Sequence, residues 1–365
     1  MIIAAHIFAA SCQESFLYNC FLPLAKEQPA NHFLLFVDKH FYTPDNLPVN
    51  IERVDIKPSL KNGLTLHYWY NFKLPSLLKK YEVTHFISES NVLSLRTTIR
   101  QFLLIRSMSF LLRKPVVMQE HARYLKRYFA KFLQKAAGVW ITEKFLGESL
   151  LSKYPAIKEK ITYTGHGLNE VFQPIDWEQK EKFLETFSSG TEYFIAECSP
   201  VTQANIFSLL KAFSLFKQRQ KSAMQLVLLV REIELENCVK DFHLYKYRED
   251  VKIISYTNDT SYATMLCASY AAVYLPLQVV TENTGLNALA SGIPLITLEN
   301  TAALSIYGDA ALYAGFSEKL IAESMMLLYK DEVLRKKLIE KGLHISYGYN
   351  WLTSATKIWQ AIKVG

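Results

Sequence analysis

Short apolar runs that alternate with segments of helical periodicity constrain the fold of this chain more than any other feature of its sequence. Parallel strands need a crossover of about a dozen residues or more, so this alternation predicts parallel sheets covered by helices on both faces. In the first half, strands are predicted at Ile2–Phe8, Phe33–Val37, Ile51–Ile56, His85–Ile87, Pro115–Gln119 and Gly138–Thr142. Helices are predicted there at Phe16–Lys26, Leu74–Lys80, Thr97–Leu112 and Arg123–Ala136. In the second half, strands are predicted at Tyr193–Ala196, Gln225–Val230, Val251–Ile254, Ala272–Leu275 and Leu295–Thr297. Helices are predicted between them at Asn205–Lys217, Tyr262–Ser269, Leu286–Ser291 and Ser317–Leu328.

The alternation is interrupted once, at a segment with the composition of an interdomain connection. Gly165-His-Gly-Leu-Asn169 holds two glycines and is soon followed by Pro174. The chain has 365 residues, half of them apolar, which is enough for two cores. We therefore predict an α/β protein with two Rossmann-like, doubly wound domains, residues 1–165 and 166–348. We expect them to face one another across a cleft at the carboxyl ends of their strands.

Composition and missing motifs argue against several classes of protein. Five scattered cysteines without metal-ligand spacing predict a reducing compartment and no zinc site. No apolar run reaches the roughly 18 residues of a membrane helix, and no secretory leader is recognisable, so a cytoplasmic location is expected. A glycine-rich dinucleotide motif, a phosphate-cradling Gly-Lys-Ser/Thr loop and a nucleophile elbow are also absent. Nicotinamide dehydrogenases, P-loop enzymes and serine hydrolases are therefore not expected.

Positive charge is concentrated in the segment Ser94–Lys135. This segment has ten Arg and Lys residues and one acid, Glu120, for a net charge of +9, whereas the whole chain carries +7. Basic side chains interleaved with Phe, Leu and Tyr suit an anionic surface, such as a lipid headgroup layer or a phosphorylated acceptor. The alternative is a solvated helical face. Nucleic acid is not an expected partner, because no recognised binding module accompanies the charge.

Several stretches occur in the order and spacing of one known family. They are Lys114–His121, Gly138–Thr142, Ile161–Pro174, Asn205–Phe213, Val251–Tyr256 with Met265–Pro276, Ala290–Ile296, Gly308–Ala311 and Tyr349–Trp351. In these stretches the chain resembles the retaining, nucleotide-sugar-dependent glycosyltransferases of family 4, which have the B-type fold of two Rossmann domains (GT-B). The resemblance implies that a nucleoside-diphosphate sugar binds the second domain. It also implies that residues 349–365 form a helix that crosses back to the first domain.

The resemblance assigns roles to the segment Glu282-Asn-Thr-Gly-Leu286. This segment is similar to the family's glutamate-x-x-glycine-leucine turn, whose glutamate touches the donor sugar, so Glu282 is a candidate catalytic residue. The alternative role for Glu282 is to cap the following helix. The family's second glutamate falls on Asn287, whose amide can hydrogen-bond a ribose hydroxyl. The candidate donor contacts in this segment are Asn283, Thr284, Gly285 and Asn287.

In the first domain, the resemblance points to a histidine and a turn. The stretch Lys114–His121 resembles the strand that delivers an active-site histidine, which makes His121 a second candidate catalytic residue. A structural histidine is the alternative. The turn after the first strand usually holds small residues that let the backbone approach the substrate. Ala10 and Ser11, together with Arg123 of the basic segment, are therefore candidate acceptor-side residues.

The chain departs from the family where the diphosphate binds. The family's basic pair falls on Ser199 and Ala204, which carry no charge. Asn205 and the N-terminus of its helix can still offer hydrogen bonds to an anion. Arg231 follows a predicted strand and can reach the same place, the alternative being a surface arginine beside Glu232. We therefore count Ser199, Asn205 and Arg231 as candidate donor-binding residues.

The resemblance implies a glycosyltransferase that moves a sugar from a nucleoside-diphosphate sugar to a saccharide or a lipid-linked, cell-envelope acceptor. Transfer would retain anomeric configuration and need neither a cofactor nor a metal. The protein would be cytoplasmic, with peripheral contact at the inner face of an anionic membrane. The alternative is a catalytically degenerate relative that serves as a binding or partner protein, and the missing basic pair and second glutamate favour that alternative.

Overall fold

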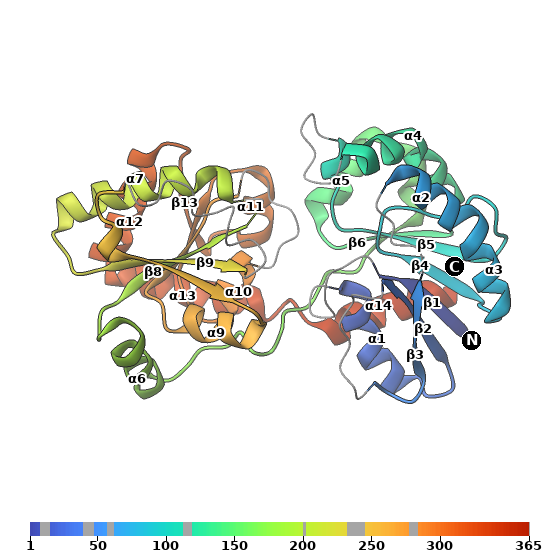
Figure 1. The fold of residues 1–365 in the computed structure, drawn as a ribbon, viewed down its shortest axis with the longest axis horizontal. Helices are drawn as coiled ribbons and strands as arrows, with labels where there is room; N and C mark the ends of the chain where they lie inside the picture. The colour runs from blue at the N-terminus through green and yellow to red at the C-terminus, as the bar shows by residue number, and fades with distance from the viewer. Residues whose placement is uncertain are drawn as a thin grey trace. The chain divides into compact units, whose positions relative to one another are not determined.

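The computed structural model describes residues 1–7, 15–38, 47–56, 62–111, 119–199, 202–231, 245–276 and 284–364. Within these ranges the chain forms two compact units (Figure 1). Unit 1 contains Met1–Gly167 together with Tyr349–Gly365, and unit 2 contains Leu168–Gly348. Each unit is an open parallel sheet with helices on both faces, which confirms the predicted α/β, doubly wound class.

Unit 1 is built on a seven-stranded parallel sheet with the order β3-β2-β1-β4-β5-β6-β7. Its strands are β1 (Ile2–His6), β2 (His32–Asp38), β3 (Ile51–Ile56), β4 (His85–Ser88), β5 (Arg100–Ile105), β6 (Gly138–Ile141) and β7 (Ile161–Tyr163). Its helices are α1 (Phe16–Glu27), α2 (Gly63–Tyr68), α3 (Leu74–Lys80), α4 (Gln119–Lys135), α5 (Lys144–Lys153) and α14 (Trp351–Val364). A π-helical turn, Trp69–Lys73, joins α2 to α3.

Apolar side chains form a core on each face of this sheet. On one face, α1 and α14 pack against each other and cover a core that includes Phe33 and Trp359. On the other face, α2, α3, α4 and α5 cover a core that includes Phe86 and Phe129. The segment Trp351–Val364 is therefore part of the core of unit 1, although the whole of unit 2 precedes it in the chain.

Two helices of unit 1 begin at side chains that replace missing backbone partners. The hydroxyl of Ser15 accepts a hydrogen bond from the N–H of Tyr18 (3.1 Å) at the start of α1. Asn62 and Thr65 form a reciprocal capping box at the start of α2. Caps of this kind contribute about 1 kcal/mol each. The cap at Asn62 fixes the first turn of a helix that lines the pocket described below.

The predicted helix at Thr97–Leu112 is wrong. Residues Arg100–Ile105 form β5, which pairs with β4 and β6, and Ser109–Leu111 is a short 3-10 turn. An apolar run of this length suits a buried strand as well as a buried helix, and only its partners in the sheet decide between them. The predicted strand at Pro115–Gln119 lies outside the described residues except for Gln119, which begins α4.

Unit 2 is built on a six-stranded parallel sheet with the order β10-β9-β8-β11-β12-β13. Its strands are β8 (Tyr193–Cys198), β9 (Gln225–Arg231), β10 (Val251–Tyr256), β11 (Ala271–Tyr274), β12 (Leu295–Leu298) and β13 (Ala311–Ala314). Its helices are α6 (Trp177–Ser188), α7 (Gln203–Gln220), α9 (Asp259–Cys267), α10 (Thr284–Ala290), α11 (Thr301–Tyr307), α12 (Glu318–Lys330) and α13 (Glu332–Ser346). Figure 1 shows α7 and α12 on one face of the sheet and α9, α10 and α13 on the other.

The cysteines differ in their state. Cys198, the last residue of β8, is disulfide-bonded, whereas Cys20 and Cys267 are free thiols. Among the helices in the described ranges, none combines the length and the apolar character needed to cross a bilayer.

Candidate functional site

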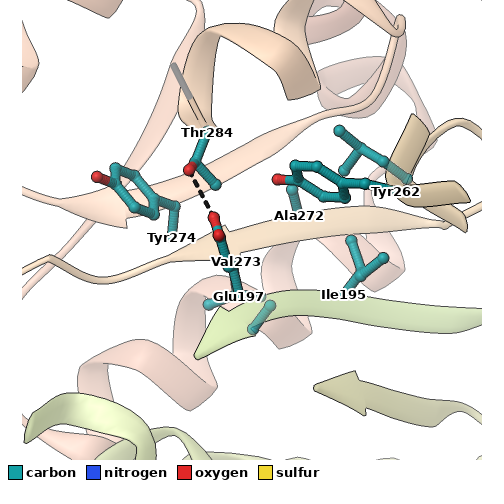
Figure 2. A pocket seen from close by; sticks show the side chains of 9 residues that line it. Ile195, Glu197, Tyr262, Ala272, Val273, Tyr274 and Thr284 are labelled. Carbon is teal, nitrogen blue, oxygen red and sulfur yellow. Dashed lines mark hydrogen bonds between the residues drawn. The ribbon is translucent and has the colours of Figure 1, made fainter. Parts of the chain in front are cut away.

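The strand order of unit 2 reverses between β8 and β11. The chain passes from β8 through α7 to β9 on one side, and from β11 on to α10 and β12 on the other side. Because α7 and α10 lie on opposite faces of the sheet, a crevice is expected at the carboxyl ends of β8 and β11 (Figure 1). A small pocket does lie there, and its lining includes Glu197, Tyr274 and Thr284 (Figure 2). In open α/β sheets this reversal point is where ligands bind.

Glu197 is the centre of this site. It is the next-to-last residue of β8, and its carboxylate accepts two short hydrogen bonds. The Tyr256 hydroxyl, at the end of β10, donates to Oε1, and the Thr284 hydroxyl, at the start of α10, donates to Oε2 (2.6 Å each). Figure 2 shows Thr284 and Glu197 pointing toward one another across the end of the sheet. One carboxylate thus ties together three elements that the sequence separates widely.

The predicted residue Arg231 adds a positive charge to this cluster. It ends β9, and its guanidinium carbon lies 5.8 Å from the ring centroid of Tyr256. The pKa of Tyr256 is raised, first by burial and then by the charge of Glu197, while Arg231 opposes the rise. Tyr256 is therefore a neutral hydrogen-bond donor at physiological pH. The structure places Arg231 beside Tyr256, whereas its predicted neighbour Glu232 lies outside the described residues.

The predicted residues Ser199 and Asn205 lie at the start of α7. The backbone N–H of Ser199 donates to the hydroxyl of Thr202 (2.9 Å), which in turn donates to the carbonyl oxygen of Glu197 (2.6 Å). The side-chain amide of Asn205 donates to the carbonyl oxygen of Leu275 (2.8 Å), just after β11. Asn205 therefore bridges the two strands at the reversal point. The side chain of Ala204 lies outside the described residues.

The first turns of α10 hold the other predicted donor contacts. A Cβ on Gly285 would overlap the hydroxyl of the buried Tyr307, so only glycine fits there. Asn287 is 8% exposed, and its Oδ1 has no hydrogen-bond partner among the described residues. A buried acceptor without a partner is costly unless water or a ligand supplies a donor. Glu282 and Asn283 lie outside the described residues.

The candidate residues of unit 1 are more scattered. The structure corrects the position of His121, which lies in the first turn of α4 and not at the end of a strand. It is 8% exposed. Arg123, two residues further on, is exposed and lines a pocket of about 520 Å³ between α2 and α4. Ala10 and Ser11 lie outside the described residues.

The sheet of unit 1 reverses its order between β1 and β4, and a carboxylate lies there too. Glu89 follows β4 and is 3% exposed at its side chain. It accepts hydrogen bonds from the hydroxyl of Ser15 and the N–H of Phe16 (2.9 Å each) and forms an ion pair with Arg106 (2.8 Å). Glu89 therefore anchors the start of α1. It also neutralises Arg106, one of the ten positive charges of the predicted basic segment.

Sequence reasoning missed Glu197. The one signal that points to it is an acid that interrupts an apolar strand at its carboxyl end, in Tyr193-Phe-Ile-Ala-Glu-Cys198. Its partners Tyr256 and Thr284 lie 59 and 87 residues away in the chain. Within the ranges that the structure covers, no three His, Cys, Asp or Glu side chains come together as metal ligands would.

No protein family and no curated protein matches the sequence. Solved structures do match, over the full length of the chain. One is sucrose-phosphate synthase from Thermosynechococcus elongatus, with a TM-score of 0.76 and 13% identity over 100% of this chain and 98% of that one. A second is a glycosyltransferase from Rickettsia africae, with a TM-score of 0.73 and 15% identity over 99% and 97%. A third is HepE from Anabaena, solved with UDP-glucose, with a TM-score of 0.73 and 11% identity over 100% of both chains.

At these identities the likeness establishes the fold. The two parallel-sheet units, with seven and six strands, match those of GT-B glycosyltransferases. This result confirms the predicted GT-B class. Because folds host many activities, the function has to be argued from the site.

Proposed function

We propose that this protein is a glycosyltransferase that moves a sugar from a nucleoside-diphosphate sugar to a saccharide or a lipid-linked, cell-envelope acceptor, with retention of configuration. The sugar nucleotide is the only small molecule besides the acceptor in this proposal, and no cofactor or metal is part of it. The observation that carries the proposal is the cluster of Glu197, Arg231, Tyr256 and Thr284 at the reversal point of unit 2. HepE, which has the same fold, was solved with UDP-glucose.

In this proposal, the diphosphate binds at the start of α7. This helix has 18 residues, and the hydroxyl of its N-cap residue, Thr202, is not used to cap it. The backbone N–H of Asn205 donates to the carbonyl oxygen of Thr202 (2.8 Å), so the proposal assigns the anion to the N–H groups of Gln203 and Ala204, where the helix dipole also favours negative charge. Arg231 supplies the only side-chain cation that we assign to the diphosphate. Full positive charge near the leaving group stabilises the negative charge that develops there.

The ribose and the donor sugar bind at α10 in this proposal. Asn287 has a buried acceptor oxygen without a partner among the described residues, and a ribose hydroxyl would satisfy it. Glu197 acts as a positioning residue, because it holds Thr284 and with it the start of the helix that follows Glu282. We assign Glu282 to the donor sugar and retain His121 as the second candidate catalytic residue.

We also propose a cytoplasmic location with peripheral contact at an anionic membrane. Three apolar side chains of unit 1, Leu64, Tyr68 and Phe72, are exposed. Phe72 stacks on Tyr68 with ring centroids 5.7 Å apart, and the guanidinium carbon of Arg96 lies 4.1 Å from the ring centroid of Phe72. An exposed apolar patch next to basic residues suits an anionic lipid surface.

A second candidate function is a binding or partner protein without turnover. The observation that favours it is the missing charge of Ser199 and the hydrogen bonds that this residue makes. This residue carries no charge, and its N–H and hydroxyl both contact Thr202 (2.9 and 3.2 Å), so it does not replace a missing cation. A protein of this kind would bind a sugar nucleotide, or a fragment of one, without transferring the sugar.

Thermal-shift titrations with UDP, GDP, ADP, CDP and dTDP, with and without Mg²⁺, test the donor site. A ligand that binds only the folded protein stabilises it by about 2.7 kcal/mol at 100 times its Kd. For a unit of this size, that stabilisation corresponds to a rise in Tm of roughly 5–10 °C. We expect a selective rise with one nucleotide. Transfer assays with that nucleotide's sugars then separate the two candidate functions, because the binding protein gives the shift without the product.

The matched variants are Glu197→Gln and Glu89→Gln, which change the carboxylates at the reversal points of the two sheets. The proposal predicts that Glu197→Gln lowers nucleotide affinity by about tenfold, since it loosens the start of α10, whereas Glu89→Gln leaves it unchanged. If no nucleotide raises the Tm, or if both variants lower the affinity equally, the donor site is not where we put it.

A further inference from the structure

The pocket between α2 and α4 in unit 1 is not used by the proposed donor site. Its volume of about 520 Å³ is within the range of small-molecule sites. The pocket lies on two helices that pack against each other, and all of its lining belongs to unit 1. The side chains that define it are His67 of α2 and Arg123, Tyr124, Arg127 and Tyr128 of α4.

The floor of this pocket is aromatic. The imidazole of His67 and the rings of Tyr124 and Tyr128 form a triangle, with centroid distances from His67 of 6.0 Å to Tyr124 and 5.7 Å to Tyr128. The two tyrosine rings are 5.0 Å apart. Burial raises the pKa of Tyr124, so its hydroxyl is neutral at physiological pH and can donate a hydrogen bond. Aromatic faces that combine with polar tips suit the apolar faces and hydroxyls of a ring.

The rim of the pocket is basic. Arg123 and Arg127 are one helical turn apart on α4, and both are exposed. Within the part of the chain that the structure describes, neither has a carboxylate partner. The guanidinium carbon of Arg127 and the Nζ of Lys131 each lie 5.6 Å from the ring centroid of Tyr128. Arginines four residues apart lie on the same face of a helix, so both guanidinium groups can reach one oxyanion.

We infer that this pocket binds a phosphate group carried by a ring-bearing ligand. Arg123 and Arg127 hold the phosphate oxygens, and Tyr124 and Tyr128 contact the ring beside them. Arginine is suited to this because its planar fork matches the oxygens of a phosphate. One part of this inference rests on the proposed function: the ligand is the acceptor, and the acceptor is a molecule that carries a phosphate group.

Isothermal titration calorimetry with glucose 6-phosphate, inorganic phosphate and glucose tests the pocket. We expect glucose 6-phosphate to bind more tightly than inorganic phosphate, and glucose not to bind detectably. The double variant Arg123→Gln/Arg127→Gln is expected to weaken glucose 6-phosphate binding by tenfold or more, about the effect of one charge-assisted hydrogen bond. Tyr128→Ala is expected to weaken binding of glucose 6-phosphate but not of inorganic phosphate.

The matched control is Lys135→Gln, which removes a positive charge from the same helix about 18 Å from Arg123 along the axis. It should leave all three titrations unchanged. The inference is overturned if Lys135→Gln weakens binding as much as the double variant does, because binding would then follow net charge alone. It is also overturned if the wild-type protein binds no soluble phosphate and its binding to anionic lipid does not depend on Arg123 and Arg127.

A vesicle assay distinguishes the two sources of the phosphate group, a lipid headgroup and a soluble sugar phosphate. The arms are vesicles of phosphatidylinositol, whose headgroup carries a ring beside its phosphate, and of phosphatidylcholine, in a sedimentation assay with wild-type protein and the double variant. If the double variant binds vesicles more weakly and the wild type does not bind glucose 6-phosphate, the pocket is supported and its phosphate belongs to a lipid headgroup. Glucose 6-phosphate binding without vesicle binding supports the pocket and identifies a soluble phosphate.

Nucleotide titration of the double variant separates this inference from the proposed function. Both arginines lie in unit 1, so the Tm rise with the selected nucleotide should be retained. Phosphate binding without any nucleotide shift in the wild type would overturn the donor site and leave the pocket in place. A nucleotide shift without phosphate or headgroup binding would overturn the pocket alone.

Discussion

The two units repeat one architecture and differ at the edge of the sheet where the strand order reverses. In unit 1, the carboxylate at this edge is Glu89, which is buried against a cation, Arg106, and against the first N–H of α1. In unit 2, the carboxylate is Glu197, whose two hydrogen bonds described above come from the neutral hydroxyls of Tyr256 and Thr284. The reversal point therefore carries an ion-paired carboxylate in unit 1 and a carboxylate held by hydroxyls in unit 2.

This difference shows how a repeated fold separates stability from binding. A buried carboxylate paired with a cation and a backbone donor is costly to disturb, and its oxygens are occupied. A carboxylate that accepts from hydroxyls can exchange those donors for the hydroxyls of a ligand, because one hydrogen bond of similar strength replaces another. We therefore expect unit 1 to use this edge mainly for structure and unit 2 to use it for recognition.

The largest expected effect comes from exchanging each carboxylate for alanine. Glu89→Ala should lower the free energy of unfolding by about 3 kcal/mol, because it leaves Arg106 and the start of α1 without their acceptor. Glu197→Ala should cost less, about 1–2 kcal/mol, because the partners it leaves are neutral. Urea unfolding, with hydrogen exchange to locate the loosened unit, measures both. The expected difference between the two carboxylates is contradicted if Glu197→Ala lowers the free energy of unfolding more than Glu89→Ala does.

A smaller effect, with opposite signs in the two units, is expected from two glycines that face a tyrosine hydroxyl. A Cβ on Gly285 would overlap Tyr307, which is fully buried and cannot move aside. Gly285→Ala should therefore destabilise unit 2 by about 2 kcal/mol through overpacking. A Cβ on Gly147 of α5 would overlap Tyr163, which is 41% exposed and can swing away. Gly147→Ala should therefore be neutral or stabilise by up to about 1 kcal/mol.

The double variant Gly285→Ala/Tyr307→Leu sharpens this comparison. A Cβ at position 285 would overlap the hydroxyl and two ring carbons of Tyr307, so removing the whole ring makes room for the new methyl group. The two changes should therefore cost less together than the sum of their separate costs. Thermal denaturation of the four proteins in the cycle measures this coupling. Additive costs would mean that Gly285 is needed for its backbone conformation and not for space.

The smallest expected effect comes from an exposed ion pair of unit 2. Lys341 donates to Asp309, and this hydrogen bond holds the pKa of Asp309 below its usual value. A lowered folded-state pKa means that the pair stabilises above the unfolded pKa of about 3.9, and that this contribution is lost as the pH falls through the folded value. Asp309→Asn should therefore lower the Tm slightly at pH 7 and not at all once the pH is below both values. A Tm difference that grows on acidification would contradict this assignment.

Much of the fold was predictable from the sequence, because strands buried on both faces leave continuous apolar runs. The strand at Ile51–Ile56 and the helix at Leu74–Lys80 are confirmed at both ends. The strand at Arg100–Ile105 was predicted as a helix, since a short apolar run fits both and only the neighbouring strands decide. The site was less predictable. Arg231 was identified because it follows a strand, but Glu197 depends on Tyr256 and Thr284, which only the sheet order brings near it.

The packing of α14 has a consequence for the order in which the protein can be completed. Ala355, Ile358 and Trp359 are part of the core that α1 and the strands of unit 1 share. All of unit 2 is synthesised before these residues, so the sheet of unit 2 can form while the part of unit 1 that α14 covers is still exposed. Synthesis of unit 1 thus begins before that of unit 2 and is completed after it. A ribosome that stalls within residues 168–348 releases a chain with an uncovered apolar face on unit 1, the kind of surface that chaperones and proteases recognise.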